Sequence, residues 1–503
     1  MKAYALEIPP AAFSGSRGRF ETVVSWLDGQ EAAGLTHAEL EARLQVESRE
    51  LFRQLLQDHL DLRAQQETRL AAVVGADGVA RGGAETGRER GLSTVFGEVR
   101  VRRTAYRTRG HADLHPADGM LNLPVERYSH GLRLLTAIES ARGSFADAAV
   151  ALERVTGQRL GNRQVEQLAR RAAADFDRFY ASRPRQLSVA GAVLVLSCDG
   201  KGIVMRPEAL RPATAKAAGT SAKKLATRLS KGEKRNRKRM AEVGAVYDTT
   251  PVPRTPGDIL PAADTQRPPS KTGPNARGKW LVASVVHDAT DVIGQVFDEA
   301  TRRDPDHHRT WVALVDGNTH QIQRIHTEAR TRGVDVTIVV DFVHVLEYLW
   351  KAAWCFFTEG DPDAETWVRA HGLRLLHGRS SDVAGAIRRK ATSARLQPGQ
   401  RAGADTCATY LTNKRPYLDY PTALEAGWPI ATGVIEGACR HLVKDRMDLT
   451  GARWGLDGAE AILKLRALRS NGDFDQYWAY HLAQEQQRVH QARYPDGVIP
   501  SVR

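Results

Sequence analysis

Hydrophobic and charged residues follow two different periods along this chain, and the change of period divides it into regions. From His37 to about Glu67, leucines and charged residues recur at helical spacing without glycine or proline, which predicts one long amphipathic helix. Its apolar face packs on the rest of the fold or, in a second interpretation, on another copy of the chain. Residues 74–90 are rich in Gly, Ala and Arg and predict a linker, whereas residues 94–107 alternate Val and Tyr with basic residues and predict a β-hairpin.

A helical hairpin is predicted in the region that follows. An apolar helix from Phe145 to Val155 precedes a glycine-containing turn and a second helix that begins at Asn162. This outline is that of a helix-turn-helix, whose second helix presents polar side chains to the edges of DNA bases. The side chains expected to face DNA are Arg163, Gln164 and Gln167. Plain helix packing is the alternative, because many helical hairpins share this pattern.

Buried, strand-like runs begin near Ser188 and indicate an α/β region. Strands are expected in 188–202, 239–248, 279–288, 309–318 and the first part of 334–350, and helices in 291–304, in 320–333 and after the last strand. Strand, strand, strand, helix, strand, helix, strand, helix is the order of a ribonuclease H-like domain, in which right-handed crossovers join parallel strands. Helical, Trp- and Arg-rich sequence in 351–430 interrupts this core, which resumes in a helix that carries Glu436.

Three acids are placed where this fold brings strand ends together. Asp199 and Asp316 each end a buried strand, and Glu436 lies on the helix expected beside them; each acid is followed by Gly. Their oxygens suit two Mg²⁺ ions that keep positions open for phosphate and water, which is the arrangement for in-line phosphoryl transfer. A single strand-end Asp is more often a turn or capping residue, so the hypothesis depends on the combination.

Composition bounds the classes of protein that fit this pattern. The 503 residues suggest about three domains, and 42% hydrophobic against 26% charged residues exclude wholesale disorder. The net charge of +13 favours a polyanionic partner. Four distant cysteines, without a CxxC pair, indicate neither a disulfide framework nor a zinc ribbon. With no signal-peptide pattern or long apolar run, we expect a cytoplasmic protein without a membrane partner.

Seven stretches give the chain a family resemblance. It resembles the DDE transposases of the bacterial insertion-sequence group called the ISKra family, which is related to Mutator-like transposases. The matching stretches, which cover most of residues 90–470, are LSCDGKGIVMRPEALR, KLATRLSKGEKRNRKRMAEVGAVYD, PVPRTPGDIL, FDEATRRDP, WVALVDGN, DFVHVLEYLWKAAWCFF and TGVIEGACRHLVKDRMDLTGARW.

The resemblance implies a ribonuclease H-like core that uses a D, D, E triad and Mg²⁺, with Mn²⁺ as a possible substitute, to cut transposon ends and join the freed 3′-hydroxyl to target DNA. It implies that Asp199 is the first acid and Glu436 the third. Asp316 and Asp341 compete for the second position. Mutator-like relatives place the second acid in a D-G element like that of Asp316, followed later by a C/D-x-x-H element that Asp341 and His344 match. We therefore expect Asp316 to bind metal and Asp341 and His344 to be accessory residues.

Two further features concern nucleic acid. Between Arg206 and Arg239, twelve Lys or Arg stand against two Glu, so this polybasic stretch is expected either to contact phosphates or to be a solvated loop. Its candidate DNA contacts are Lys231, Lys234, Arg235, Arg237, Lys238 and Arg239. Trp454, in a Gly-rich loop, is a further candidate, to stack on a base. Relatives carry cysteine pairs in the N-terminal region that are absent from 96–119 here, so no zinc is expected.

Together these expectations describe a multidomain α/β protein: a ribonuclease H-like catalytic core with a helical insertion, preceded by a mainly helical DNA-binding region with a small β-ribbon. The expected parts are an N-terminal helical region (1–90), the ribbon (91–128), the helix-turn-helix region (129–185), the catalytic domain (186–350 and 431–470, with a basic insertion 206–279), the helical insertion (351–430) and a C-terminal tail (471–503). We expect a homo-oligomeric DNA transposase that binds double-stranded DNA, both element ends and target, at the bacterial nucleoid. The rivals are a nuclease without strand transfer and a non-catalytic or domesticated DNA-binding regulator.

Overall fold

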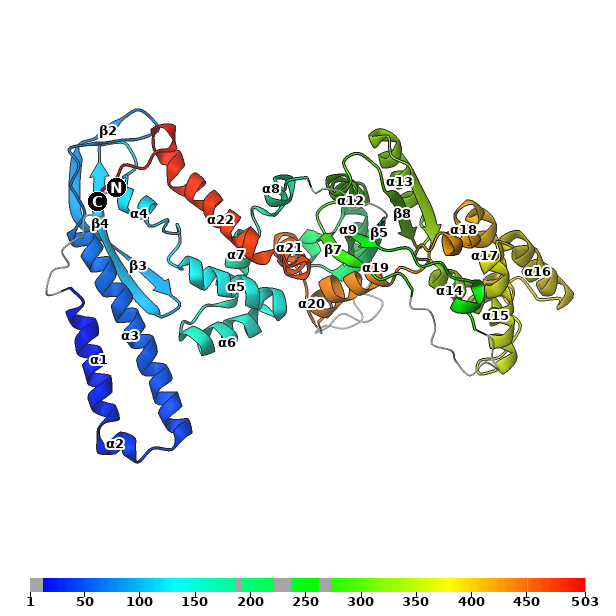
Figure 1. The fold of residues 1–503 in the computed structure, drawn as a ribbon, viewed down its shortest axis with the longest axis horizontal. Helices are drawn as coiled ribbons and strands as arrows, with labels where there is room; N and C mark the ends of the chain where they lie inside the picture. Colours follow the sequence, from blue (N-terminus) through cyan, green and yellow to red (C-terminus); the bar gives the residue numbers. More distant parts are fainter. Residues whose placement is uncertain (1–11, 186–191, 221–236, 262–272, 450, 503) are drawn as a thin grey trace. The chain divides into compact units, whose positions relative to one another are not determined.

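The computed structural model describes residues 12–185, 192–220, 237–261, 273–449 and 451–502. The chain forms two compact units, unit 1 (Met1–Ala181 and Asp473–Arg503) and unit 2 (Ser182–Gly472) (Figure 1). Both contain helices and strands, which confirms the mixed α/β class. Among the described residues, no helix is both long enough and apolar enough to cross a membrane.

Unit 1 begins with a helical hairpin. Helix α1 (Ser14–Leu27) is followed by the short α2 (Gln30–Ala33) and by α3 (His37–Gln65), which lies beside α1 (Figure 1). Thr36 caps α3, because its hydroxyl accepts from the main-chain N–H of Glu39 while the Glu39 carboxylate accepts from the N–H of Thr36. The long helix predicted from the leucine spacing is confirmed.

A β-hairpin follows, and it starts earlier than predicted. Strands β3 (Gly83–Thr94) and β4 (Gly97–Arg107) pair antiparallel, with Thr94 opposite Gly97 at the turn. Val99 and Val101 are buried on the face of β4 that packs on α3, whereas Arg100 and Arg102 are exposed. The prediction of a linker in residues 74–90 is wrong, because the small pair β1 (Val73–Val74) and β2 (Ala80–Arg81) and most of β3 lie there.

The predicted helix-turn-helix outline is present as part of a three-helix group. Helices α5 (His130–Arg142), α6 (Phe145–Thr156) and α7 (Asn162–Ala172) surround an apolar core, to which Leu132, Leu152 and Val165 contribute. A left-handed Gly157, with φ of 71°, ends α6 and allows the turn.

The C-terminal segment is not a tail. Its helix α22 (Phe474–Val489) belongs to unit 1, where a buried network ties it to α5 and to the end of α7. Arg133, which is fully buried, pairs with Glu485 at 3.2 Å, while the Asp175 carboxylate accepts from His481 and Arg488. A buried charge needs such partners, since burying it unpaired is costly. The prediction of a tail in 471–503 is therefore wrong.

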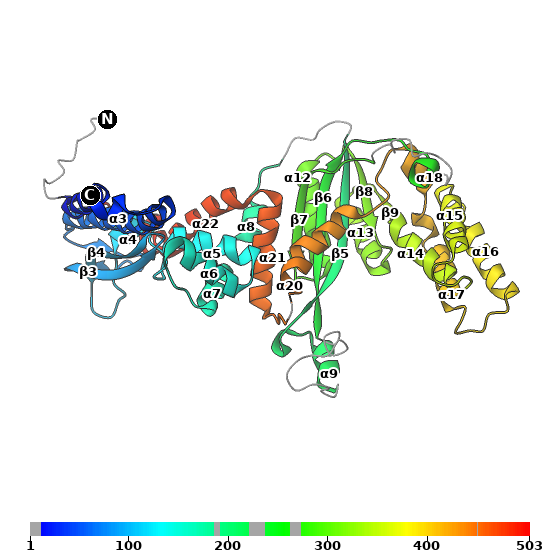
Figure 2. The same ribbon diagram turned by 90° about the horizontal axis from the view of Figure 1, so that it is seen from below.

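Unit 2 is built on a five-stranded mixed sheet in the order β7-β6-β5-β8-β9 (Figure 2). Its strands are β5 (Val193–Val204), β6 (Lys238–Thr249), β7 (Arg277–Ser284), β8 (Thr310–Val315) and β9 (Val336–Val340). Strand β6 pairs antiparallel with both β5 and β7, and β8 and β9 run parallel to β5. Helices α12 (Ala289–Arg303) and α13 (Thr319–Arg332) make the connections to β8 and β9. All five strands lie where the apolar runs predicted them.

The connections of this sheet differ from prediction at one place. Residues 206–279 are not a single insertion, because β6 divides them into two connections. The first contains α9 (Pro212–Thr220), and the second contains the short α11 (Pro256–Ile259).

The expected helical insertion follows α14 (Phe342–Ala353), the helix predicted after the last strand. It comprises α15 (Pro362–Leu376), α16 (Ser380–Ser393), α17 (Ala402–Asn413) and α18 (Tyr420–Glu425). The chain then returns along β5 and β6 in α19 (Gly433–Ala438) and a π-helical segment (Cys439–Lys444), followed by α20 (Asp445–Met447) and α21 (Leu456–Asn471) (Figure 2).

Candidate active site

Three aspartates stand in one row at the carboxyl end of the parallel pairing between β5, β8 and β9. Strands β5 and β8 pair through Ser197 and Leu314, and continuing that register by two residues places Asp199 opposite Asp316. Strands β8 and β9 pair through Val315 and Val340, and one further step places Asp316 opposite Asp341. The main-chain N–H of Asp341 donates to the Val315 carbonyl at 2.8 Å, which fixes this edge. Ligand sites of α/β sheets form at such carboxyl ends.

Asp199 lies where β5 continues beyond its parallel partner. Its Oδ1 accepts the N–H of Gly200 at 2.7 Å, and its Oδ2 accepts the thiol of Cys439, whose sulfur is 3.4 Å away. Burial and the nearby Asp199 carboxylate both raise the pKa of Cys439, so this thiol stays protonated and donates. Cys439 opens the π-helical segment three residues after Glu436, and this contact brings the Glu436 helix to the first acid.

Glu436 is linked to the row through Thr432. The Thr432 hydroxyl donates to the Asp341 carboxylate and lies 3.2 Å from Oε1 of Glu436. Thr432 is 7% exposed, whereas Glu436 itself is exposed and available to a ligand. One hydroxyl hydrogen serves one acceptor at a time, so this side chain couples the two carboxylates.

The turn that carries Asp316 is held from the helical insertion. Tyr410 of α17 donates its phenolic hydrogen to the main-chain carbonyl of Asp316 at 2.8 Å, and its ring stacks on Tyr348 with centroids 4.0 Å apart. Burial raises the pKa of Tyr410, and Tyr348, Asp316 and Asp341 raise it further, so it remains a donor. Lys414 donates to the Thr319 hydroxyl at 2.6 Å and lies near the Asp316 carboxylate. Burial lowers the pKa of Lys414, whereas the charge of Asp316 raises it.

The surroundings of Asp316 and Asp341 differ. Asp341 is 1% exposed; its Oδ1 accepts the N–H of Val343 as the cap of α14, and its Oδ2 accepts from Thr432. Asp316 is half-buried and uses Oδ1 for the N–H of Asn318. His344, also half-buried, lies 3.6 Å from Glu347 and packs edge-on against Tyr348. Asp316 is therefore the more accessible of the two carboxylates.

The donor chemistry of these acids fits Mg²⁺. Among the described residues, no three His, Cys, Asp or Glu side chains converge closely enough to hold one ion. Mg²⁺ does not need such a cage, because it is commonly held by one or two carboxylates, waters and substrate phosphates. The hard oxygens of Asp199 and Asp316, in register at one edge, meet that requirement.

Glu242 is a further acid at this sheet that the sequence pattern did not single out. It lies on β6 opposite Gly200, and an added Cβ on that glycine would lie 3.3 Å from Glu242 Oε2. Burial raises the pKa of Glu242, and the Asp199 carboxylate raises it further. The only sequence signal was an acid inside an otherwise apolar strand.

The predicted DNA-reading residues of α7 are all at the surface. Arg163, Gln164 and Gln167 are exposed on the face opposite the buried Val165 and Leu168. Gln164 also accepts the N–H of Gly161 at 2.9 Å and so caps the helix.

The predicted contacts of the polybasic stretch fall in several environments. Lys231, Lys234 and Arg235 lie outside the described residues. Lys238 is exposed and Arg237 half-buried, whereas Arg239 donates to the carbonyls of Val285 and Ala209.

The prediction that Trp454 stacks on DNA is wrong. The side chain is 5% exposed, its indole N–H donates to the Met447 carbonyl at 3.0 Å, and Arg446 covers its ring. Its main chain also bonds to Val204 and Arg206 beside β5. Trp454 therefore fastens the loop to the sheet.

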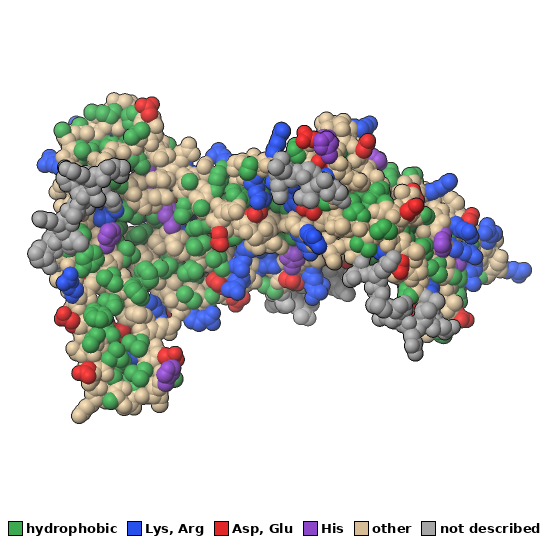
Figure 3. All heavy atoms as spheres, viewed as in Figure 1, with side chains coloured by type: hydrophobic (Ala, Val, Ile, Leu, Met, Phe, Trp, Pro, Cys, Tyr) green, Lys and Arg blue, Asp and Glu red, His purple; other side chains and the backbone are tan. Residues whose placement is uncertain are grey.

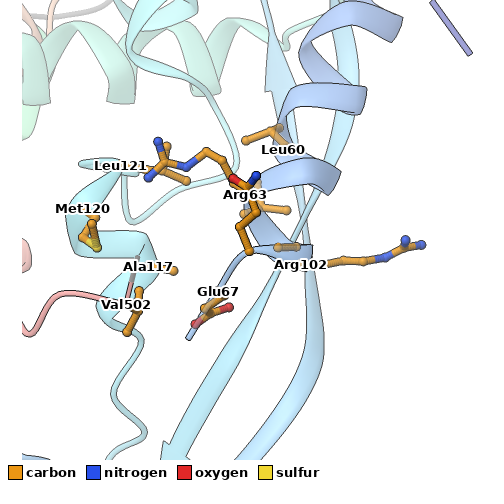
Figure 4. A pocket seen from close by; sticks show the side chains of 11 residues that line it. Leu60, Arg63, Glu67, Arg102, Ala117, Met120, Leu121 and Val502 are labelled. Atoms are coloured by element: carbon orange, nitrogen blue, oxygen red, sulfur yellow. The ribbon is translucent and has the colours of Figure 1, made fainter. Parts of the chain in front are cut away.

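A small cavity in unit 1 lies between α3, β4 and α4 (Pro116–Met120) (Figure 4). Its volume of about 30 Å³ is enough for little more than a water molecule. Glu67 lines it and accepts the N–H of Thr104. The cavity is too small for a substrate.

Comparison with known proteins does not extend this description: no protein-family model matches the chain, and no curated protein is significantly similar to it.

Proposed function

We propose that this chain is a DNA transposase of an insertion sequence, of the ISKra type, which cuts the ends of its element and joins them to target DNA. The observation that carries the proposal is the row of acids, with Asp199 and Asp316 in register at one sheet edge and Glu436 coupled to that edge through Thr432. The strand order β7-β6-β5-β8-β9, with β6 antiparallel and β8 parallel to β5, supports a ribonuclease H-like fold for the catalytic domain.

Each side chain has a role in that chemistry. When bound, Mg²⁺ would activate a water or 3′-hydroxyl and neutralise charge on the transferred phosphate. Asp199, Asp316 and Glu436 would supply its protein ligands. Asp341 and Thr432 orient Glu436, and Tyr410 holds the turn of Asp316 in place. His344 is an accessory residue at the same edge.

Recognition of the element ends is assigned to α7. A recognition helix needs a buried face that fixes it and polar side chains free to reach bases in the major groove. Val165 and Leu168 provide the buried face. Arg163 and Gln167 provide the polar side chains, and Gln164, which also caps the helix, is exposed beside them. The protein would work on the DNA of the bacterial nucleoid.

The homo-oligomer expected of a transposase is supported by the N-terminal hairpin. Exposed apolar side chains recur at helical spacing along both long helices: Phe20, Val24 and Leu27 on α1, and Leu44, Phe52 and Leu55 on α3. An exposed face of this kind is typical of an interaction surface.

The charges on this hairpin favour a second copy as the partner. Arg17 is exposed at one end of the face, and Asp28, Glu31 and Glu41 are exposed at the other. An antiparallel, two-fold pairing of hairpins would bring these opposite charges together. Light scattering tests this: we expect the wild type to be a dimer or larger and Phe52→Glu to be smaller, and a monomeric wild type would contradict it.

The proposal is tested by incubating the wild-type protein with Mg²⁺ and a plasmid that bears the sequences flanking its gene. Products in which flanking ends are joined to new DNA sites support a transposase. Cleavage without joining would identify a nuclease, and end-specific binding without cleavage a regulator.

A further inference from the structure

The helical insertion carries a concentration of positive charge that the active site does not use. Between residues 366 and 404 there are eight Lys or Arg and one acid, Asp382. Most of these residues lie on α16 or on the segments that flank it. The face of unit 2 shown in Figure 3 has Lys and Arg side chains gathered over this end.

Six of these cations are exposed: Arg374, Arg379, Arg388, Arg389, Lys390 and Arg395. None of the six forms an ion pair with a carboxylate of the described residues. Arg388 reaches only the Thr412 hydroxyl at 3.5 Å, and Lys390 lies over the rings of Phe356 and Phe357. We call these six side chains the insertion surface.

The β-hairpin of unit 1 provides the contrast. Its exposed arginines are engaged within the fold: Arg102 bonds to Glu89, Arg107 to Glu85 and Asp113, and Arg88 pairs with Glu85. Such arginines must break an existing pair before they bind phosphate. The arginines of the insertion surface have no such ion pair to break in the described part of the chain, so no paired carboxylate there neutralises their positive charge.

The insertion surface is also mechanically connected to the active site. Helix α16 packs on α17, and α17 supplies the Tyr410 hydroxyl that holds the Asp316 turn. Arg379 stands at the beginning of α16 and Arg389 ten residues later, about 15 Å along the helix axis. DNA advances about 3.4 Å per base pair, so this distance corresponds to roughly four base pairs of backbone.

We propose that the insertion surface binds the sugar–phosphate backbone of duplex DNA and so holds it in line with the Asp199–Asp316 edge. The inference rests on the proposed function. It assigns part of the DNA contact to the helical insertion, for which the sequence predicted only a helical fold. It names phosphate as the group recognised, because exposed guanidinium and ammonium groups bind phosphate oxygens through both charge and hydrogen bonds.

The test compares two double variants that each remove two positive charges from unit 2. Arg379→Gln with Arg389→Gln removes unpaired charges. The matched control is Arg332→Gln with Arg401→Gln, because Arg332 pairs with Asp298 and Glu328 and Arg401 pairs with Asp405. Arg379 and Arg389 are exposed and the two control arginines are half-buried, so a thermal melt verifies that each full-length variant is folded.

Affinity for a random-sequence 30-base-pair duplex is measured between 50 and 200 mM NaCl. Each phosphate contact contributes about 0.9 to the slope of log affinity against log salt. We expect the slope of the test variant to fall by about 2, so that wild type loses roughly tenfold more affinity than this variant over the range. The control should keep the wild-type slope.

Equal slopes for the test variant, the control and wild type would overturn the inference while leaving the proposed function intact. Loss of binding to polyglutamate in the test variant, with its DNA slope unchanged, would identify an acidic protein as the ligand instead. Failure of the wild type to bind duplex DNA at all would reject the proposed function itself.

Discussion

Tyr410 donates a hydrogen bond from its phenolic hydroxyl to the main-chain carbonyl of Asp316, the residue that follows β8. The contact joins the helical insertion to the turn of the second acid across 94 residues of sequence. Gly317, with φ of 91°, sits so close beneath the Tyr410 hydroxyl that a side chain there would collide with it. The insertion is therefore part of the framework of the candidate active site.

Removing this contact should slow the chemistry without preventing DNA binding. We expect Tyr410→Phe to reduce strand joining about 10-fold, as is usual when a residue that orients a ligand is lost, and to cost roughly 1 kcal/mol of unfolding free energy. Joining rates and urea titrations measure the two effects. The matched control is Tyr417→Phe, whose hydroxyl contacts His326 at the surface. Equal joining rates for both variants would contradict a positioning role for Tyr410.

Thr432 gives a second prediction, because its hydroxyl faces two carboxylates. Thr432→Val keeps the shape of the side chain but leaves the buried Asp341 carboxylate with one partner fewer, which should cost about 1–3 kcal/mol of unfolding free energy. It should also lower the affinity for Mn²⁺, measured by calorimetry with DNA present, because Glu436 is no longer oriented. Thr432→Ser restores the hydroxyl and should restore both properties. A serine variant as impaired as the valine variant would show that packing, and not the hydroxyl, matters.

These contacts mark the limit of what the sequence could predict. An apolar run that ends in Asp is a local signal, so the strands of the sheet were predicted correctly and Asp316 and Asp341 directly follow β8 and β9, whereas β5 continues past Asp199 to Val204. Tyr410 and Thr432 carry no such signal, because an ordinary helical tyrosine and a loop threonine gain their roles only from partners 94 and 91 residues away.

Two errors have the same origin. Residues 471–503 were predicted as a tail because the partner that orders them, Arg133 on α5, is 352 residues from Glu485. Trp454 was predicted to face DNA from its Gly-rich neighbourhood, but its burial is decided by β5, some 250 residues earlier. The prediction of a linker in 74–90 failed for another reason: glycines such as Gly83 were taken to exclude a strand, whereas pairing with β4 stabilises one there.

The helix-turn-helix assignment predicts a sequence-dependent loss of affinity. Arg163→Ala and Gln167→Ala should each weaken binding to element ends by about 1–3 kcal/mol, the range for a bidentate base contact, and change binding to random duplex much less. The control is Arg159→Ala, because Arg159 is engaged with Glu153 at 2.6 Å. Fluorescence anisotropy with both DNAs measures the difference. An equal loss on the two DNAs would mean that α7 contacts only the backbone.

The buried network of unit 1 predicts how stability depends on pH. Burial tends to raise the pKa of Asp175, but the hydrogen bonds from His481 and Arg488 outweigh it and lower the pKa to about 2. Burial likewise opposes the bonds from Arg133 and Arg488 that lower the pKa of Glu485 to about 2. Because both folded pKa values lie below the unfolded ones, the stabilisation is complete above about pH 5 and is lost as pH falls toward 2.

Each carboxyl should contribute on the order of 2 kcal/mol at neutral pH. Asp175→Asn should therefore be clearly less stable than wild type at pH 6 and nearly equal to it near pH 2, as measured by urea unfolding. Asp475→Asn, at an exposed position of α22, should match wild type at both pH values. A stability difference for Asp175→Asn that stays constant from pH 6 to 2 would contradict the ionic role of this carboxyl.

The most direct test of the central claim is a joining assay with DNA that bears the element ends, in Mg²⁺, on variants that still bind those ends as wild type does. We expect joined products to disappear in Asp199→Asn, Asp316→Asn and Glu436→Gln and to persist at a reduced level in Asp341→Asn, because Asp341 is buried and acts through Thr432. Joining retained by Asp316→Asn and abolished in Asp341→Asn would move the second metal ligand to Asp341. A wild type that binds the ends but neither cuts nor joins them would contradict the account as a whole.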